Sequence, residues 1–335
     1  MDSLDLVEFA RTLIDIDSTT GIEGEVARVL ARALEQLGYH VTLQPLAGDR
    51  VNVYARIDDP VVVFSTHFDC VPPFFPSRIE NGRLYGRGSS DAKGILAAQL
   101  VAAERMRARG ERRVGLLFVA GEERGSDGAM AANTIAPASA KYLINGEPTE
   151  NRLGAATRGV YRVSLTARGR AAHSSRPDLG ESAIEKLLDA LQALRTATWP
   201  SDPLLGETHF NIGLINGGLA PNVIPDLATA ELLFRSVGPA EDLAAVIDRA
   251  VAGKVEVAHV LTVPPVRLKT LPGFTTEVFW YTTDIPFLDR WGTPLLIGPG
   301  SVTEAHTADE SVPVAELEAA ADLYEKLATG LLRYP

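Results

Sequence analysis

The sequence has little of several features that would point to particular classes of protein. It has one cysteine, Cys70, so no internal disulfide can form and a reducing compartment fits. It lacks an excess of positive charge, because 32 lysines and arginines stand against 43 aspartates and glutamates, which gives a net charge of −11. That balance argues against nucleic acid or an anionic membrane as a partner.

Long apolar runs, repeats and low-complexity tracts are also missing. No stretch is apolar enough to span a membrane. The N-terminal segment Met1–Asp5 is acidic and has no basic region, so we expect no signal peptide and a cytoplasmic protein. With 335 residues, 46% hydrophobic and 22% charged, the chain has the composition of a globular enzyme large enough for two domains.

The most informative feature present is an apolar run that ends in a histidine and an aspartate. Residues 61–66 are apolar or small, and His67 and Asp69 follow them. Residues two apart in a strand point to the same face, so the imidazole and the carboxylate lie side by side. Such a carboxylate usually orients a histidine toward a metal. The alternative is a simple hydrogen-bonded polar pair at a strand end.

Acidic residues and a second histidine follow other apolar runs. They are Glu122 and Glu123 after residues 114–119, Glu147 after residues 142–145, and His306 after residues 294–297. Asp91 lies in the glycine-rich segment 86–94. In open α/β sheets, ligands bind outside the carboxyl ends of the strands. Imidazole and carboxylate together suit zinc and similar ions, so the sequence predicts a two-metal site.

These motifs, in this order, resemble the di-zinc amidohydrolases that include aminoacylase, acetylornithine deacetylase, succinyl-diaminopimelate desuccinylase and glutamate carboxypeptidase. The resemblance covers nearly the whole chain. It is carried by His67–Pro72, Gly86–Gly94, Glu122–Glu123, Glu147–Pro148 and His306. Within the family, His209–Gly213, Gly217–Pro225 and Gly298–Glu310 look most like the acetylornithine and acetylcitrulline deacetylase branch.

The resemblance implies two zinc ions, for which cobalt can substitute, bridged by Asp91. His67 and Glu147 would complete one site, and Glu123 and His306 the other. It also implies that the peptide bond between Asp91 and Ala92 is cis.

For catalysis, the resemblance points to Glu122, Asp69 and His173. Glu122 would be the general base, which takes a proton from the metal-activated water and delivers it to the leaving amine. The alternative is that one of Glu122 and Glu123 only offsets the charge of the site. Asp69 would orient the first ligand. His173 matches a histidine that reaches across a dimer to the neighbouring active site, and a plain surface histidine is the alternative.

For substrate binding, Asn222 and Arg235 match positions that hold the α-carboxylate of the substrate, and Arg158 is a plausible second contact. Arginine suits a carboxylate because its planar fork forms two parallel hydrogen bonds. A solvated or salt-bridged strand face is the alternative for both arginines. Gly298 and Gly300 could bring backbone N–H groups close to the substrate.

The expected fold is α/β, with a zinc-exopeptidase-like catalytic domain formed by residues 1–156 and 264–335. Its first half alternates strands with helices, one of them opened by the Asp91 carboxylate. Residues 157–263 read as β-α-β-β-α-β, a ferredoxin-like unit. That unit is an insertion, because His306 lies beyond it, and we expect it to act as a lid and to form a homodimer.

The first functional hypothesis is hydrolysis of an N-acyl-amino acid, such as acetylated ornithine, citrulline or lysine, in amino-acid metabolism such as arginine biosynthesis. The second is a carboxypeptidase or dipeptidase that cleaves small peptides by the same chemistry. The third is a metal-binding homologue without catalysis. The segment Phe279–Asp284 is expected to line the side-chain pocket, where Asp284 could hold a cationic ornithine or lysine.

Overall fold

The computed structural model describes residues 4–333, and the chain forms two compact units. The first unit consists of Met1–Ala155, Leu268–Glu277 and Thr283–Pro335. The second consists of Ala156–Arg267 and Val278–Thr282. The expectation that the chain has no signal peptide rests partly on residues 1–3, which lie outside the described residues.

The first unit is built on a mixed sheet. Its strands are β1 (His40–Pro45), β2 (Val51–Arg56), β3 (Val62–His67), β6 (Val114–Val119), β7 (Tyr142–Asn145) and β19 (Thr293–Leu296). The strand order is β1-β2-β6-β3-β7-β19. Strands β6, β3, β7 and β19 run parallel to one another, so their carboxyl ends meet at one edge, whereas β2 pairs antiparallel with both β1 and β6. Every residue of β3 and β6 is buried, as expected for strands covered on both faces.

Helices and an apolar cluster cover the two faces of this sheet. The helices of the unit are α1 (Leu6–Ile14), α2 (Gly24–Gln36), α3 (Lys93–Ala108), α4 (Asp127–Ala132) and α7 (Val314–Leu332). Successive side chains of β3 point to opposite faces. Phe64 packs on one face, with its ring centroid 5.4 Å from that of Tyr324 in α7. Val63 packs on the other face in a cluster that includes Trp291, which is fully buried.

The start of α3 differs from the sequence prediction. We expected the Asp91 carboxylate to open this helix, but the helix begins at Lys93 with Ala92 as its N-cap and no side-chain cap. The Asp91–Ala92 peptide is cis, as the resemblance implied. The Asp91 side chain is bonded to His67 instead of the helix N–H groups.

Three short strands of the first unit were not predicted from the sequence. They are β4 (Arg78–Glu80), β5 (Arg83–Tyr85) and β20 (Ser311–Pro313), in the order β20-β5-β4. This small sheet joins the chain that follows His306 to the chain that precedes Gly86. A further sheet, in the order β17-β8-β18, contains the residues where the chain passes from one unit to the other. Its strands are β8 (Leu153–Thr157), β17 (Val266–Arg267) and β18 (Thr276–Phe279).

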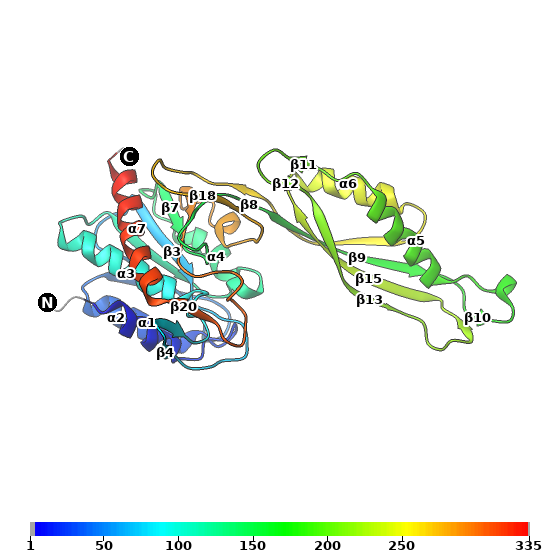
Figure 1. The fold of residues 1–335 in the computed structure, drawn as a ribbon, viewed down its shortest axis with the longest axis horizontal. Helices are drawn as coiled ribbons and strands as arrows, with labels where there is room; N and C mark the ends of the chain where they lie inside the picture. The colour runs from blue at the N-terminus through cyan, green and yellow to red at the C-terminus, as the bar shows by residue number, and fades with distance from the viewer. Residues whose placement is uncertain (1–3, 334–335) are drawn as a thin grey trace. The chain divides into compact units, whose positions relative to one another are not determined.

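The second unit has the predicted β-α-β-β-α-β order. Its elements are β9 (Gly159–Arg168), α5 (Ala183–Thr196), β13 (His209–Gly217), β15 (Leu227–Ser236), α6 (Ala240–Val251) and β16 (Glu256–Val263). The sheet is antiparallel with the order β13-β15-β9-β16. Helices α5 and α6 lie on the same face of this sheet (Figure 1), and their apolar sides share its core. The predicted α/β fold with an inserted ferredoxin-like unit is therefore confirmed.

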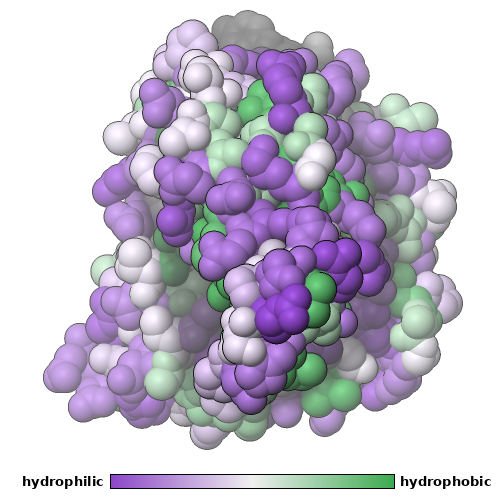
Figure 2. Space-filling view, turned by 90° about the vertical axis from the view of Figure 1, so that its right-hand side faces the viewer, coloured by the Kyte–Doolittle hydropathy of each residue, from purple (hydrophilic) through white to green (hydrophobic). Residues whose placement is uncertain are grey.

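Short strand pairs complete the second unit. They are β10 (Ala172–His173) with β14 (Val223–Ile224), and β11 (Ser201–Asp202) with β12 (Gly206–Glu207). The face of the molecule in Figure 2 is mainly hydrophilic, and hydrophobic residues are scattered across it in small groups. Within residues 4–333, the helices are all too short or too polar to cross a membrane.

Candidate metal centre

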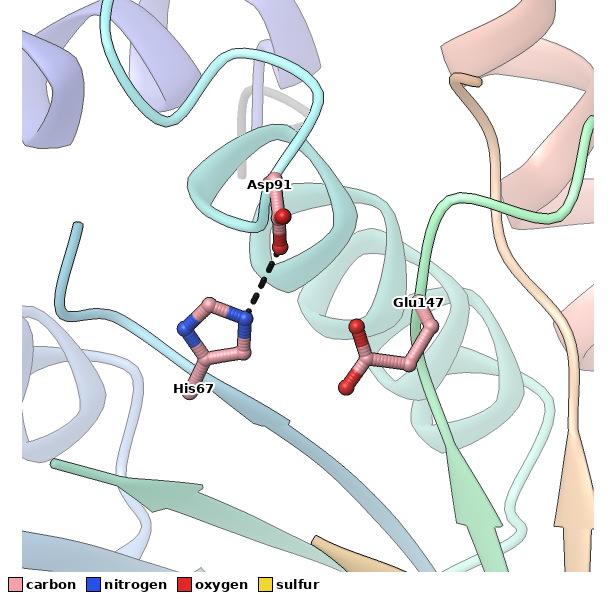
Figure 3. A group of neighbouring side chains, drawn as sticks. All are labelled: His67, Asp91 and Glu147. Carbon is pink, nitrogen blue, oxygen red and sulfur yellow. Dashed lines mark hydrogen bonds and ion pairs between the residues drawn. The ribbon is translucent and has the colours of Figure 1, made fainter. Parts of the chain in front are cut away.

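The predicted ligands lie at the carboxyl edge of the first unit's sheet. The register of β3 and β7 pairs Ser65 with Asn145, so His67 and Glu147, each two residues further on, lie level with one another. Figure 3 shows His67 at the end of β3, Asp91 in the turn before α3 and Glu147 in the loop after β7. All three side chains point into the same space. The sheet thus brings together residues that are far apart in the sequence.

The hydrogen bonds of His67 leave one ring nitrogen facing a carboxylate. Nδ1 lies 3.0 Å from the backbone carbonyl oxygen of Asp69. A carbonyl oxygen can only accept, so Nδ1 carries the proton and Nε2 keeps its lone pair in the neutral ring. Nε2 lies 2.9 Å from Oδ1 of Asp91. Two acceptors at this distance repel each other unless a cation, either a proton or a metal ion, lies between them.

His306 repeats this arrangement on the other oxygen of Asp91. Its Nε2 lies 3.4 Å from Asp91 Oδ2 and 2.9 Å from Glu123 Oε1. These two carboxylates raise the pKa of His306 to about 10. For His67, burial lowers the pKa, but Asp69 and Asp91 outweigh it and the pKa lies well above its ordinary value. Both histidines therefore lie among carboxylates whose negative charges stabilise a positive charge at these positions.

The ligand atoms form two sets that share Asp91. In the first set, His67, Asp91 and Glu147 have ligand atoms that all lie within 4.8 Å of one another. In the second, Asp91, Glu123 and His306 satisfy the same limit. Oε1 of Glu147 is buried and has no hydrogen-bond partner among residues 4–333. Each set has the imidazole and carboxylate donors that suit zinc and similar ions, and Asp91 offers one oxygen to each. The residues fit a pair of metal ions.

Asp69 supports the metal centre through hydrogen bonds. It is fully buried, and its carboxylate accepts the backbone N–H groups of Glu122 at 3.1 Å and Glu123 at 3.2 Å, as well as the Thr20 hydroxyl at 2.8 Å. Asp69 was expected to orient His67, and both its backbone carbonyl oxygen, at 3.0 Å, and its carboxylate oxygen Oδ1, at 3.4 Å, face Nδ1 of that ring. The carboxylate also fixes the turn that carries the two glutamates. Asp69 is thus a positioning residue.

Glu122 lies beside the centre without belonging to either ligand set. It occupies the 3₁₀ turn Glu122–Arg124 directly after β6. Burial raises the pKa of Glu122 well above its ordinary value, and the negative charges of Glu147 and Asp284 raise it further. This carboxylate is therefore disposed to accept and hold a proton, which is what a general base must do.

Sequence reasoning missed Glu310, a fully buried carboxylate that holds the Asp91 loop. Its Oε1 accepts the backbone N–H groups of Gly88, Ser90 and Asp91, each at 3.0 Å. Its Oε2 accepts Nη1 of Arg87 at 2.6 Å, and that guanidinium is also buried. Glu310 follows His306 by four residues, so one side chain links the loops of two ligands. The sequence did show an acidic residue, Glu310, at the end of the segment that contains His306. Its partners are mostly backbone N–H groups, which the sequence does not reveal.

The structure corrects the expectation for Gly298 and Gly300. The Gly298 N–H donates to the Thr149 hydroxyl at 2.9 Å, and the Gly300 N–H donates to Glu316 at 3.0 Å, so neither is free for a substrate. The two glycines serve close packing instead. A Cβ on Gly298 would lie 2.5 Å from the backbone oxygen of Glu147, and one on Gly300, which has φ +82°, would lie 2.3 Å from the Ser90 hydroxyl.

The other predicted residues lie in the second unit. His173 is exposed in β10, where its Nδ1 lies 2.8 Å from the Ser175 hydroxyl. Asn222 is exposed just before β14, and its carbonyl oxygen accepts the Ser174 N–H. Because β10 pairs with β14, His173 and Asn222 lie close together.

Arg158 and Arg235 both lie next to His209. Arg235 is paired with His209 across β15 and β13, and Nη1 of Arg158 donates to His209 Nδ1 at 2.8 Å. Arg158 is only 5% exposed, its guanidinium lies 4.3 Å from the Trp280 ring centroid, and its Nε has no partner among the described residues. Burial lowers the pKa of both arginines, and neither has an acidic partner within residues 4–333. The salt-bridged alternative therefore does not apply to this pair, which suits an anion.

Comparison with known proteins identifies the family. Residues 63–330 match the model of "Peptidase family M20/M25/M40". The chain belongs to this family. The M20-family chain is 37% identical over 343 residues to a "Peptidase M20 domain-containing protein" of Schizosaccharomyces pombe. The alignment covers 98% of this chain and 85% of the relative. The chain is 35% identical over 373 residues to a "Probable carboxypeptidase" of Aspergillus clavatus, with coverage of 98% and 82%.

A solved structure has a similar fold. The aminopeptidase PepT of Bacillus cereus superposes with a TM-score of 0.81 at 22% identity and covers 97% of both chains. Membership of the M20 family, together with the two ligand sets, makes this chain a metal-dependent hydrolase of the metallopeptidase class.

Proposed function

We propose that this M20-family chain hydrolyses the amide bond next to a C-terminal amino acid whose carboxylate is free. The observation that carries the proposal is the pair of ligand sets on Asp91 with Glu122 beside them. When bound, a pair of metal ions would supply Lewis-acid activation of water and of the amide carbonyl. The metals proposed are two zinc ions, with cobalt as a substitute, because the donor set is imidazole and carboxylate.

The protein's own residues would move the proton. Glu122 takes a proton from the attacking water and passes it to the nitrogen of the leaving amine as the amide bond breaks. Asp69 fixes the backbone of Glu122, so the base is held in place before the substrate arrives. General acid–base catalysis of this kind contributes about 10²- to 10⁴-fold to the rate.

The free carboxylate of the substrate would be bound by the second unit. Arg158 and Arg235 supply two guanidinium groups without acidic partners, and we propose Asn222 as a further polar contact. Replacement of Arg158 by Met should raise KM strongly for a substrate with a free carboxylate and little for its amide. Arg168, an exposed arginine at the other end of β9 that pairs with Glu256, provides the matched control as Arg168→Met.

Two substrate classes fit this chemistry. One is an N-acyl-amino acid such as N-acetylornithine, N-acetylcitrulline or N-acetyl-lysine, as the resemblance to the deacetylase branch implies. The other is a small peptide cleaved by a carboxypeptidase or dipeptidase, which the name of the Aspergillus relative favours. Hydrolysis of acetylated, succinylated and formylated amino acids and of dipeptides, with zinc or cobalt added, would separate the two. No hydrolysis of any of them would favour a metal-binding homologue without catalysis.

We further propose a homodimer formed through the second unit, with His173 completing the partner's active site. The exposure of His173 and its support by Ser175 are consistent with a histidine that acts on a group outside its own surroundings. A cytoplasmic location stays a prediction of the sequence.

A further inference from the structure

Trp280 is a large aromatic residue to which the proposed reaction assigns no part. The sequence predicted that the segment Phe279–Asp284 lines the side-chain pocket, and Trp280 is the only exposed residue of that segment. Its exposed fraction is 60%, whereas Phe279 and Asp284 are buried. Tryptophan has a large apolar surface and is highly buried on average in folded proteins. An indole that is this open therefore offers apolar surface to a ligand.

The ring is fixed by residues of the second unit, to which Trp280 also belongs. Cζ of Arg158 lies 4.3 Å from the indole centroid, and the ring centroid of His209 lies 5.9 Å from it. The Arg158 N–H donates to the Phe279 carbonyl oxygen at 3.0 Å, so the backbone beside the indole is bonded to the backbone that carries the guanidinium. A cation–π contact and a backbone hydrogen bond thus hold the ring in place, which lowers the entropy cost when a ligand packs on it.

The charge around the ring is positive. Arg158 and Arg235 both lie next to His209, and within residues 4–333 neither arginine has an acidic partner. Burial lowers the pKa of His209, and the charges of the two arginines lower it further, so this imidazole is neutral at pH 7. Like charges repel, so these surroundings disfavour a lysine or ornithine side chain on the indole. An apolar side chain carries no such penalty.

We propose that Trp280 binds the side chain of the substrate's C-terminal residue and makes this chain selective for aromatic and large aliphatic side chains. The inference rests on the proposed amide hydrolysis and narrows its substrate class. A carboxylate bonded to Arg158 lies about 3 Å from the guanidinium nitrogens. That guanidinium is in contact with the indole, so the side chain on the adjacent α-carbon lies within reach of the ring. Peptides and acylated amino acids that end in an apolar residue are then better substrates than acetylated ornithine or lysine.

Two substrate series that differ only in the C-terminal residue test the inference in the metal-loaded enzyme. The first series is alanyl-alanine, alanyl-phenylalanine and alanyl-lysine. The second is the Nα-acetyl derivatives of alanine, phenylalanine and lysine, so both proposed substrate classes are covered. The wild type should prefer the phenylalanine member to the alanine member by about 10- to 100-fold in kcat/KM, the gain from burying a large apolar side chain. The lysine member should be no better than the alanine member.

The variant Trp280→Ala should remove the preference, because kcat/KM falls for the phenylalanine members and stays close to the wild-type value for the alanine members. Trp280→Phe keeps a ring beside Arg158 and should retain most of the preference. Neither variant removes a buried residue, so the fold should persist. Leu188→Ala is the matched control, because Leu188 is an apolar residue of α5 in the same unit and is 47% exposed. This control should keep the wild-type preference.

Binding of free phenylalanine gives a readout that needs neither metal nor turnover. In the chelated protein, phenylalanine should shift the tryptophan emission to shorter wavelength, because its packing removes water from the Trp280 ring. Alanine should cause no shift. Trp280→Phe should also show none, because it lacks the indole that reports the binding.

Three results would overturn the inference. The first is a wild type that does not prefer the phenylalanine members, or that prefers the lysine members. The second is a Trp280→Ala enzyme that loses the same factor on every member, which would mean that the indole only covers Arg158. The third is the absence of an emission shift with phenylalanine. If the metal-loaded wild type hydrolyses none of the six compounds, the proposed amide hydrolysis is wrong, and the emission shift alone decides whether Trp280 binds this class of side chain.

Discussion

Replacing Glu310 with Gln should destabilise the first unit strongly even when no metal is bound. The amide keeps one oxygen for the N–H groups of Gly88, Ser90 and Asp91, but its NH₂ then faces Nη1 of Arg87, which now lies 2.6 Å from an accepting oxygen. Two hydrogen-bond donors, the Gln NH₂ and the Arg87 guanidinium, would then face each other. The Arg87 side chain is only 2% exposed, so its positive charge would be buried without a negative partner. Breaking a buried ion pair by removing one partner costs about 3–5 kcal/mol.

An exposed ion pair supplies the control. Arg105 and Asp322 lie 2.7 Å apart with exposed fractions of 42% and 76%. Exposed pairs contribute about 0–1 kcal/mol, so Asp322→Asn should change the free energy of unfolding by no more than that. The two variants remove the same charge and differ in burial.

The assay is urea unfolding followed by the fluorescence of Trp291. Of the three tryptophans, Trp199 and Trp280 lie in the second unit, and Trp291 lies in the first. In a Trp199→Phe, Trp280→Phe background, fluorescence therefore reports the unit that carries Glu310. A chelator in the buffer removes the contribution of metal binding to stability. If Glu310→Gln lowers the free energy of unfolding by no more than Asp322→Asn does, the assignment of Glu310 as the residue that holds the Asp91 loop is refuted.

Three further predictions follow from the same geometry. Glu122→Gln should keep the fold and bind metal as the wild type does but lose at least about 10²-fold in turnover, measured at saturating zinc, because the amide cannot carry the proton; wild-type turnover would exclude Glu122 as the base. Gly300→Ala should lose more than about 3 kcal/mol in the free energy of unfolding, because its Cβ would lie 2.3 Å from the Ser90 hydroxyl. Gly110 has φ +90° and nothing within 4 Å, so Gly110→Ala should lose only about 1–2 kcal/mol, the cost of a left-handed backbone conformation. Equal losses in the two variants would mean that the Gly300 loop shifts to make room for the Cβ. Mixing the inactive variants His173→Ala and Glu122→Gln should restore activity at one site of each mixed dimer, and no recovery despite demonstrated subunit exchange would mean that His173 does not act across a dimer.

The positions of His67 and Glu147 could be predicted because His67 ends one buried strand and Glu147 comes two residues after another. The strand pattern gave the sheet, and the parallel register then placed the two residues level with each other. The β-α-β-β-α-β order of the second unit was predictable for the same reason, because periodicity of apolar residues is local. Asp91 and His306 lie in loops. The sequence pattern pointed to them as ligands, but only the family resemblance assigned Asp91 as the bridge and His306 to the second site.

The contributions of Glu310 and of the two glycines could not be read from the sequence. The partners of Glu310 are backbone N–H groups more than 200 residues away, and hydrogen bonds to backbone leave no trace in residue types. Gly298 and Gly300 suggested exposed N–H groups, but Thr149 and Glu316 take them. The helix α3 begins later than predicted because the Asp91 side chain is bonded to His67 and does not cap it. Tertiary contacts decided each of these points.

The central claim is a pair of metal sites that share Asp91, and metal stoichiometry tests it most directly. The chelated protein should bind two zinc ions in a calorimetric titration, and metal analysis after dialysis should agree. His306→Ala removes a ligand from the second set only, so it should bind one ion and lose activity, whereas His40→Ala, an exposed histidine in β1, should bind two. A wild type that binds one ion at saturation, or a His306→Ala variant that still binds two with full activity, would contradict the account.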